Sequence, residues 1–226
     1  MDTRKYYEAY EDRYRQVHGH GLRWFSSDPS PIVETVIQKF SITHQHRILE
    51  VGCGEGRDAI PLLAQGYDLL ATDISETAIG FCRETAPQFA PRFQILDCVK
   101  GYLESSFDFI YAISLVHMLV EDADRDGFYS FIREHLTDDG IALVCTMGDG
   151  EFERKSDITT AFNLQKRVHE ASGTVLMLAG TSYRAVSFST FEQELVRNSL
   201  AIIEQGITLI EPDYHQVMYA VVKKGE

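Results

Sequence analysis

The stretch ILEVGCGEGRDAI, residues 48–60, decides the fold, because an apolar run is followed there by three glycines at alternate positions. The glycines are Gly52, Gly54 and Gly56, and Glu50 stands two residues before the first of them. Glycine has no side chain, so its backbone can come close to a ligand and can adopt a positive φ. A strand that enters a helix through such a turn is typical of sites for nucleotide-like ligands.

Short apolar runs alternate with helical patterns on both sides of this loop. The patterns predict strands at 46–51, 68–73, 92–97, 107–115 and 140–147, and helices at 57–65, 75–86 and 124–136. Strands that are apolar throughout and are separated by helices indicate a parallel sheet covered on both faces. In such sheets ligands bind beyond the carboxyl ends of the strands.

The end of the chain departs from this alternation. A helix is expected over 189–200, followed by strands at 207–211 and 216–224 that only a few residues connect. So short a connection makes the two strands antiparallel to each other. We therefore expect one α/β domain.

Two further segments lie outside the strand–helix alternation. In residues 1–40, Tyr6, Tyr10 and Tyr14 follow one helix face, a second helix is expected at 30–40, and Trp24 lies in the loop between them. The other segment, 148–188, contains polar residues around VLMLAG and is the expected substrate wall. Its candidates are Asp149, Glu151, His169, Tyr183 and Arg184, although charges there are equally compatible with a solvated helix face over KSDITTAFNLQKRVHE.

These patterns divide the single domain of residues 1–226 into four parts. We expect an N-terminal helical lid (1–40), a cofactor-binding core (46–147), a substrate-side insertion (148–188) and a closing helix with strands (189–226).

Charge and composition narrow the class of partner. Thirty-four acidic residues against 21 basic ones give a formal net charge of −13, which repels nucleic acid phosphates and anionic membrane surfaces. We therefore expect a small-molecule partner, with neither nucleic acid nor membrane. Composition leaves the oligomeric state open.

The cysteines and the chain start point to a reduced compartment and to no metal. Cys53, Cys82, Cys98 and Cys145 form no CxxC pair, and no His/Cys cluster has zinc-ligand spacing. No apolar run approaches the ~20 residues of a membrane span, and the polar start MDTRKYYEAYEDRYR lacks the apolar core of a signal peptide. The expected location is the cytoplasm.

Acidic residues at strand ends discriminate between possible ligands. The loop reads G-x-G-x-G, and Arg57 stands where the dinucleotide pattern G-x-G-x-x-G needs its third glycine. Asp73, at the end of the second strand, suits the two hydroxyls of a ribose, and Asp97 could accept from an adenine amino group. Glu50 would repel a pyrophosphate and attract a positive charge, so a cationic nucleoside fits better than a dinucleotide.

At this point the sequence resembles a known family. LEVGCGEGRD, followed by ATD and ILDC, resembles the motifs of class I S-adenosylmethionine-dependent methyltransferases, and residues 52–73 are most similar to its small-molecule enzymes. The resemblance covers mainly residues 46–147. It implies a doubly wound, Rossmann-like sheet of seven mostly parallel strands, with the last strand antiparallel and helices on both faces.

The resemblance also implies roles for matching positions. Gly52, Cys53, Gly54 and Gly56 would lie under the methionine part and the ribose, Glu50 would reach the amino group, and Arg57 could help with the carboxylate. Asp73, with Ile74 beside it, would hold the ribose hydroxyls. Asp97 and the backbone of Cys98 would contact adenine, and Ser114 and Leu115 would flank the sulfonium. Tyr14 and Trp24, together with Tyr6, could close over the cofactor, or could simply pack in the core.

The expected reaction is in-line methyl transfer from S-adenosylmethionine to a small molecule. His117, just past the fourth strand, is the candidate general base if the acceptor carries a proton, or else a polar residue at a helix start. Oxygen, nitrogen, sulfur and carbon acceptors all remain open. The alternatives are an NAD(P)-dependent oxidoreductase on a related fold and a non-catalytic module that binds S-adenosylmethionine.

Overall fold

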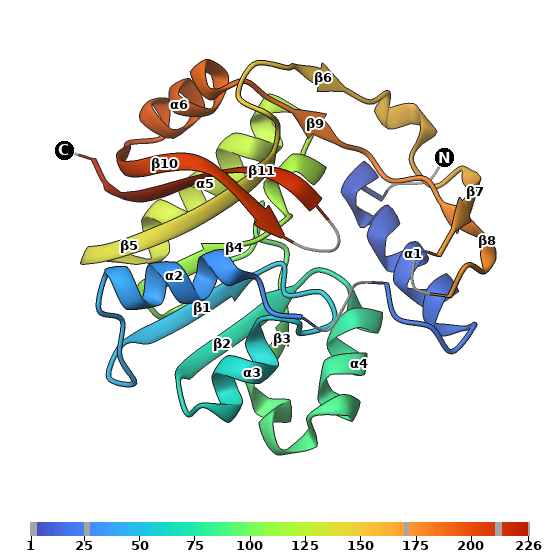
Figure 1. The fold of residues 1–226 in the computed structure, drawn as a ribbon, viewed down its shortest axis with the longest axis horizontal. Helices are drawn as coiled ribbons and strands as arrows, with labels where there is room; N and C mark the ends of the chain where they lie inside the picture. Colours follow the sequence, from blue (N-terminus) through green and yellow to red (C-terminus); the bar gives the residue numbers. More distant parts are fainter. Residues whose placement is uncertain (1–3, 25–27, 170–171, 211–213, 226) are drawn as a thin grey trace.

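The computed structural model describes residues 4–24, 28–169, 172–210 and 214–225. Its central feature is one sheet, to which the described residues contribute seven strands (Figure 1). Their order across the sheet is β10 (Leu200–Ile210), β11 (Tyr214–Lys224), β5 (Leu136–Met147), β4 (Phe107–Ala112), β1 (Arg47–Val51), β2 (Asp68–Asp73) and β3 (Phe93–Ile95). All neighbours pair in parallel except β11, which is antiparallel to both β5 and β10.

Helices cover both faces of this sheet, as Figure 1 shows. The α-helices are α1 (Ala9–His18), α2 (Pro31–Lys39), α3 (Ala59–Ala64), α4 (Glu76–Thr85), α5 (Asp122–His135) and α6 (Phe188–Arg197). The 3-10 turns are η1 (Tyr6–Glu8), η2 (Pro87–Arg92), η3 (Val116–Met118) and η4 (Ile158–Thr160). The expected fold class is thereby confirmed.

The core has two layers because successive strand residues point to opposite faces. In β4, Phe109 and Tyr111 pack with α2, α3 and α4, whereas Ile110 and Ala112 pack with α5 and α6. Strands buried on both sides therefore read as unbroken apolar runs rather than as alternating ones.

Local signals set most helix ends. The Ser75 hydroxyl caps α4 by accepting the Ala78 N–H at 3.0 Å, and Pro31 occupies the first position of α2. Gly66 follows α3 with φ +92°, a conformation that a residue with a side chain adopts at a cost.

Two strands begin well before their predicted first residues. The strand expected at 140–147 begins at Leu136, because Leu136 already pairs with Phe107 and the strand continues through residues 137–140 with a register shift. The strand expected at 207–211 begins at Leu200 instead, while its predicted last residue, Glu211, lies outside the described residues. In both, pairing with a neighbouring strand extended the element beyond its apolar pattern.

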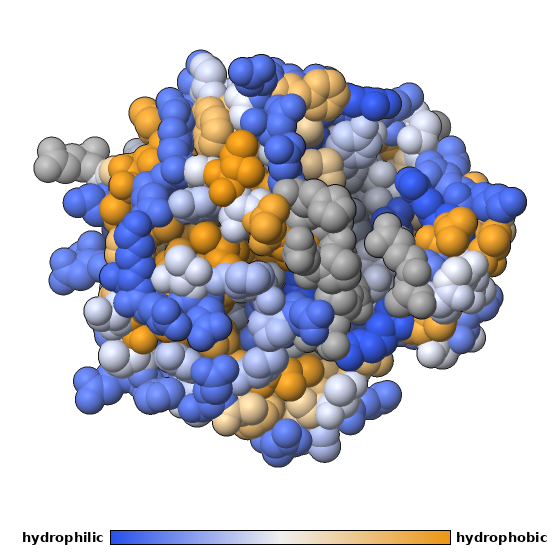
Figure 2. Space-filling view, in the orientation of Figure 1, coloured by the Kyte–Doolittle hydropathy of each residue, from blue (hydrophilic) through white to orange (hydrophobic). Residues whose placement is uncertain are grey.

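Among the described residues of KSDITTAFNLQKRVHE the helical element is the three-residue 3-10 turn η4, so the alternative interpretation as a solvated helix face is wrong. Residues 148–188 instead contain one hairpin, β7 (Leu164–Val168) with β8 (Val175–Ala179), and the short strands β6 (Arg154–Lys155) and β9 (Arg184–Ala185), which pair antiparallel on either side of it in the chain. The β7–β8 hairpin packs against α1, with Leu176 and Leu178 on Val17. Figure 2 shows apolar side chains gathered over it, where Leu164, Val168, Val175 and Met177 are exposed.

Candidate functional site

A cleft opens at the carboxyl ends of the parallel strands, with about 900 Å³ of empty space when the part open to solvent is included. Its described lining residues come from the N-terminal segment, from the glycine loop and from the ends of β2, β3 and β4. They are Tyr7, Tyr10, Tyr14, Glu50, Val51, Gly52, Cys53, Gly54, Glu55, Arg57, Asp58, Asp73, Ile74, Leu96, Asp97, Cys98, Val99, Ile113, Ser114, Leu115, Met118 and Leu119. Most of the predicted cofactor-binding residues are thus brought together; Gly56 and Trp24 are not among the lining residues.

The glycine loop needs its glycines for conformation and for space. Gly52, Gly54 and Gly56 have φ of +79°, +51° and +76°, in the left-handed region. The N–H groups of Gly52 and Cys53 donate to the Thr72 carbonyl at 2.7 and 2.9 Å, which ties the loop to β2. A Cβ at Gly54 would lie 2.6 Å from the Tyr14 hydroxyl, so the loop runs directly beneath α1.

Asp73 holds the loop from the end of β2. One carboxylate oxygen accepts the Gly54 N–H at 2.8 Å, and the other accepts the Ser75 N–H at 2.8 Å. Burial raises the pKa of Asp73, although these two hydrogen bonds act to lower it. The carboxylate therefore links the glycine loop to the start of α4 and still has lone pairs directed at the cleft.

Glu50 is a buried carboxylate at the base of the cleft. It is only 3% exposed, and the Tyr111 hydroxyl donates to its Oε2 at 2.9 Å. Burial, followed by the nearby charge of Asp58, raises the pKa of Glu50 well above its usual range. A cationic group that entered the cleft would stabilise the ionised form, so the site favours a positively charged ligand.

Glu50→Gln is expected to stabilise the ligand-free protein at alkaline pH. Because the pKa of Glu50 is higher in the folded chain, the folded state binds more protons above the ordinary value of 4.5, and stability falls as the pH rises toward the raised pKa. Glutamine keeps an acceptor for Tyr111 without that loss. We expect the melting temperature to rise by about 2–4 °C at pH 8 and to change little near pH 4. Glu104→Gln, at an exposed position, is the control, and a lower melting temperature at pH 8 would contradict this account.

Asp97 and Cys98 lie after β3, on the same cleft. Asp97 accepts the Val99 N–H at 2.9 Å, and the Tyr7 hydroxyl donates to it at 3.3 Å. Burial and the charge of Asp97 raise the pKa of Tyr7. The sequence analysis missed Tyr7, because it assumed one continuous helix and so selected Tyr6, Tyr10 and Tyr14. Tyr6 and Tyr7 instead lie in the 3-10 turn η1, which has a different period.

The three tyrosines predicted on one helix face have two different roles. Tyr10 and Tyr14 line the cleft, but Tyr6 does not, because its hydroxyl accepts the N–H groups of Val120 and Glu121 at 2.8 and 3.1 Å. Tyr6 therefore joins the N-terminal segment to the chain after η3.

Trp24 lies beside the cleft rather than in it, which corrects the expectation that it closes over the ligand. Its backbone N–H donates to both carboxylate oxygens of Glu55, at 2.8 and 3.0 Å, and the Arg13 guanidinium stands 4.7 Å from its ring centre. His18 contacts the same carboxylate at 2.7 Å. The sequence analysis does not select Glu55 as a site residue, although its position between Gly54 and Gly56 is a signal that could have identified it.

Arg57 and Asp58 complete the loop's charged groups. Arg57 donates to the Ser30 hydroxyl at 3.0 Å and lies 3.7 Å from Asp58, which also accepts the Ser30 N–H and O–H at 2.5 and 2.9 Å. Asp58 therefore anchors the start of α2 to the loop, a contact between distant segments that no local pattern reveals.

His117 does not line the cleft, which corrects its expected position beside the reacting atoms. It is 3% exposed, and burial together with the charge of Arg125 lowers its pKa to about 4. An imidazole with so low a pKa is a weak base near neutral pH. The turn η3 brings Met118 and Leu119 to the cleft instead.

Ser114 and Leu115, predicted to flank the reacting centre, do line the cleft. Ser114 has φ +55°, a conformation that costs energy for a residue with a side chain. Leu115 reaches the glycine loop, since a Cβ at Gly52 would lie 2.2 Å from its Cδ1. The candidates from 148–188, namely Asp149, Glu151, His169, Tyr183 and Arg184, are absent from the described lining residues.

Neither a metal-binding cluster nor a helix that could span a membrane occurs in the described ranges. They hold no group of three or more His, Cys, Asp or Glu residues that could bind a metal ion. Among the helices they contain, none is long and apolar enough to cross a membrane.

Residues 49–142 match a family described as a methyltransferase domain. A putative methyltransferase of Geobacillus sp. (strain WCH70) is 34% identical over 117 residues, which cover 49% of this chain and 46% of the relative. The chain spans about half the length of the curated relatives it matches.

Solved structures share the fold over most of the chain. The CcbJ methyltransferase of Streptomyces caelestis has a TM-score of 0.70 at 14% identity, covering 96% of this chain and 99% of the other. A 1,6-didemethyltoxoflavin-N1-methyltransferase of Burkholderia thailandensis, with 1,6-didemethyltoxoflavin and S-adenosylhomocysteine bound, has a TM-score of 0.65 at 16% identity, covering 87% and 77%. Both similarities concern the fold.

Proposed function

Since residues 49–142 match the methyltransferase domain family, we propose that this protein is an S-adenosylmethionine-dependent methyltransferase acting on a small-molecule acceptor. The observation that carries the proposal is the cleft itself, where a glycine cradle and three acids from different strands meet. The curated relatives and the fold neighbours named above support it.

The residues of the cleft fit S-adenosylmethionine. Gly52 and Gly54 leave space that a Cβ would fill, and the buried Glu50 is suited to the ammonium group. Asp73 would accept from the ribose hydroxyls and Asp97 from the adenine amino group. Cys98 would add its backbone, Ile74 and Leu115 would pack on the nucleoside, and Arg57 would hold the carboxylate.

In this reaction the protein mainly aligns the acceptor atom with the methyl group and excludes water. When bound, the cofactor would supply a methyl group on a sulfonium, which the acceptor atom would take while the carbon–sulfur bonding pair stays on sulfur. Tyr10, Tyr14 and Met118 would enclose the acceptor side of the cleft and keep water out. We assign no proton transfer to His117, so a proton on the acceptor would leave to solvent.

Charge favours this cofactor over a dinucleotide. Glu50, Glu55, Asp58 and Asp73 all line the cleft, and these four acids would repel a diphosphate. Among the described lining residues, Arg57 is the one lysine or arginine that could offset this repulsion. We therefore expect S-adenosylmethionine to bind with a dissociation constant on the order of micromolar, and NADH to show no saturable binding.

Calorimetry with S-adenosylmethionine, followed by a fluorescence titration with NADH, tests this expectation. Incubation with thiophenol, aniline or catechol and detection of S-adenosylhomocysteine by mass spectrometry then tests transfer. Heat of binding for S-adenosylmethionine together with product from one acceptor supports the enzyme. Tight NADH binding would instead support an oxidoreductase. Binding of S-adenosylmethionine without methyl transfer to any supplied acceptor would support a non-catalytic module.

A further inference from the structure

The segment from Ser114 to Glu121, here called the wall segment, forms the side of the cleft after β4. Four of its residues line the cleft: Ser114, Leu115, Met118 and Leu119. Its regular structure is one 3-10 turn, so many of its backbone groups cannot be satisfied by a neighbouring strand or a long helix. What holds this segment in place therefore shapes the site.

Three side chains from outside the wall segment bind its backbone. Arg125 of α5 donates to the carbonyls of Val116 and Leu119 at 2.7 and 3.1 Å. Arg184 of β9 donates to the Val120 carbonyl at 3.0 Å. From the other side, the Tyr6 hydroxyl accepts two N–H groups of the same segment, as described above.

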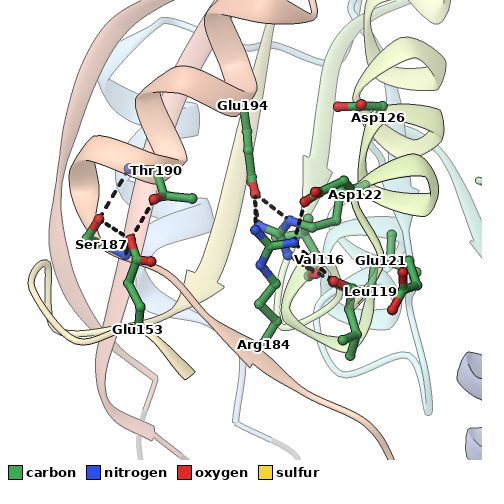
Figure 3. Close-up of polar contacts among 12 residues, drawn as sticks. Val116, Leu119, Glu121, Asp122, Asp126, Glu153, Arg184, Ser187, Thr190 and Glu194 are labelled. Atoms are coloured by element: carbon green, nitrogen blue, oxygen red, sulfur yellow. Dashed lines mark hydrogen bonds and ion pairs between the residues drawn. The ribbon is translucent and has the colours of Figure 1, made fainter. Parts of the chain in front are cut away.

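A buried carboxylate of α6 holds the two arginines together. Glu194 accepts from Arg125 at 2.8 and 2.6 Å and lies 3.6 Å from Arg184. Figure 3 shows Arg184 and Glu194 pointing toward one another, with Asp122 and the carbonyls of the wall segment alongside. Arg125 and Glu194 are fully buried, whereas the Arg184 side chain is 18% exposed, so Arg184 can be replaced without leaving a charge sealed in the core.

We propose that Arg184 is a positioning residue for the cleft, which holds the acceptor-side wall in place through the Val120 carbonyl. The inference rests on the proposed function for its link to methyl transfer. It gives residues 148–188 a role that differs from direct contact with a substrate: β9 reaches the site through the backbone of the wall segment. The cofactor contacts proposed above lie mostly on the glycine loop and on the ends of β2 and β3, so they should depend less on Arg184.

Arg184→Met tests this in the full chain. We expect the amides of Met118 to Glu121 to exchange with deuterium about tenfold faster, because one charge-assisted hydrogen bond to the segment is lost. Affinity for S-adenosylmethionine should change less than about twofold, while the rate of transfer to thiophenol falls about tenfold. Arg184→Lys keeps a cationic donor, so it should recover part of the amide protection and part of the transfer rate.

Two control variants separate the wall contact from ordinary ion pairing. Asp122→Asn removes the carboxylate that pairs with Arg184 at 2.6 Å but leaves the Val120 carbonyl contact, and Arg154→Met removes a guanidinium from the paired strand β6. In both variants, the amide exchange of Met118 to Glu121 and the rate of methyl transfer should equal those of the parent. Unchanged exchange in Arg184→Met, or equal acceleration in Asp122→Asn, overturns the inference. Failure of the parent to bind S-adenosylmethionine would sink the proposed function instead, while the exchange comparison would still decide the role of Arg184.

Discussion

Asp73→Ala is expected to weaken S-adenosylmethionine binding at least about 100-fold, or about 3 kcal/mol, because the change removes two things at once. The first is the carboxylate proposed to accept from the ribose hydroxyls. The second is the acceptor for the Gly54 and Ser75 N–H groups, whose loss releases the glycine loop from β2 and α4. Isothermal calorimetry, carried out well below the melting temperature of the variant, measures the loss.

Asp68→Ala is the matched control for this experiment. Asp68 begins the same strand at its other end, where it forms an exposed ion pair with Arg92 at 2.6 Å. An exposed pair contributes little, so this variant should bind as the parent does. Equal affinity in the parent and in Asp73→Ala would overturn the ribose assignment.

Gly54→Ala is expected to cause a loss of similar size through geometry. The added Cβ would lie 2.6 Å from the Tyr14 hydroxyl, and Tyr14 is 4% exposed and packed against Tyr10 and Ala78. Either the glycine loop or the buried Tyr14 side chain must shift, and both line the cleft. Alanine at φ +51° adds a backbone cost of about 1–2 kcal/mol. Calorimetry with S-adenosylmethionine should show about 100-fold weaker binding.

The double variant Gly54→Ala/Tyr14→Phe separates the two causes. Without the hydroxyl, the nearest atom to the added Cβ is the Cζ ring carbon of residue 14 at 3.6 Å, which is an ordinary van der Waals contact. Part of the affinity for S-adenosylmethionine should therefore return. Gly66→Ala measures the backbone cost alone, because Gly66 has φ +92° and nothing lies within 4 Å of an added Cβ. If the double variant binds no better than Gly54→Ala, the proximity of Tyr14 does not explain the loss.

Much of this site could be predicted before any coordinates. Glu50, Asp73 and Asp97 were chosen because each stands at the end of an apolar run, and parallel strands bring such ends to one edge of a sheet. The glycine spacing marked the loop in the same way. These signals are local: they depend on residues that follow one another in the chain, so periodicity and turn chemistry are enough to read them.

The errors concern residues whose position depends on distant segments. Trp24 and His117 were placed at the cleft from their proximity in sequence to the lid and to β4, yet the Glu55 carboxylate and a buried 3-10 turn set their positions. Residues 164–168 were read as part of a possible helix face, but they pair with 175–179 and form a hairpin. Tyr7 escaped notice because η1 precedes the regular helix.

The sequence by itself determined the parallel sheet, the glycine turn and the acids at the strand ends, since each follows from local periodicity or from the conformational freedom of glycine. Only the tertiary structure decided which side chains close the cleft and which hold its walls. Glu55 with Trp24, Tyr6 with Val120, and Arg184 with the Glu194 cluster join segments far apart in the chain. Such contacts leave no periodic trace, because their spacing in sequence is set by how the whole chain packs.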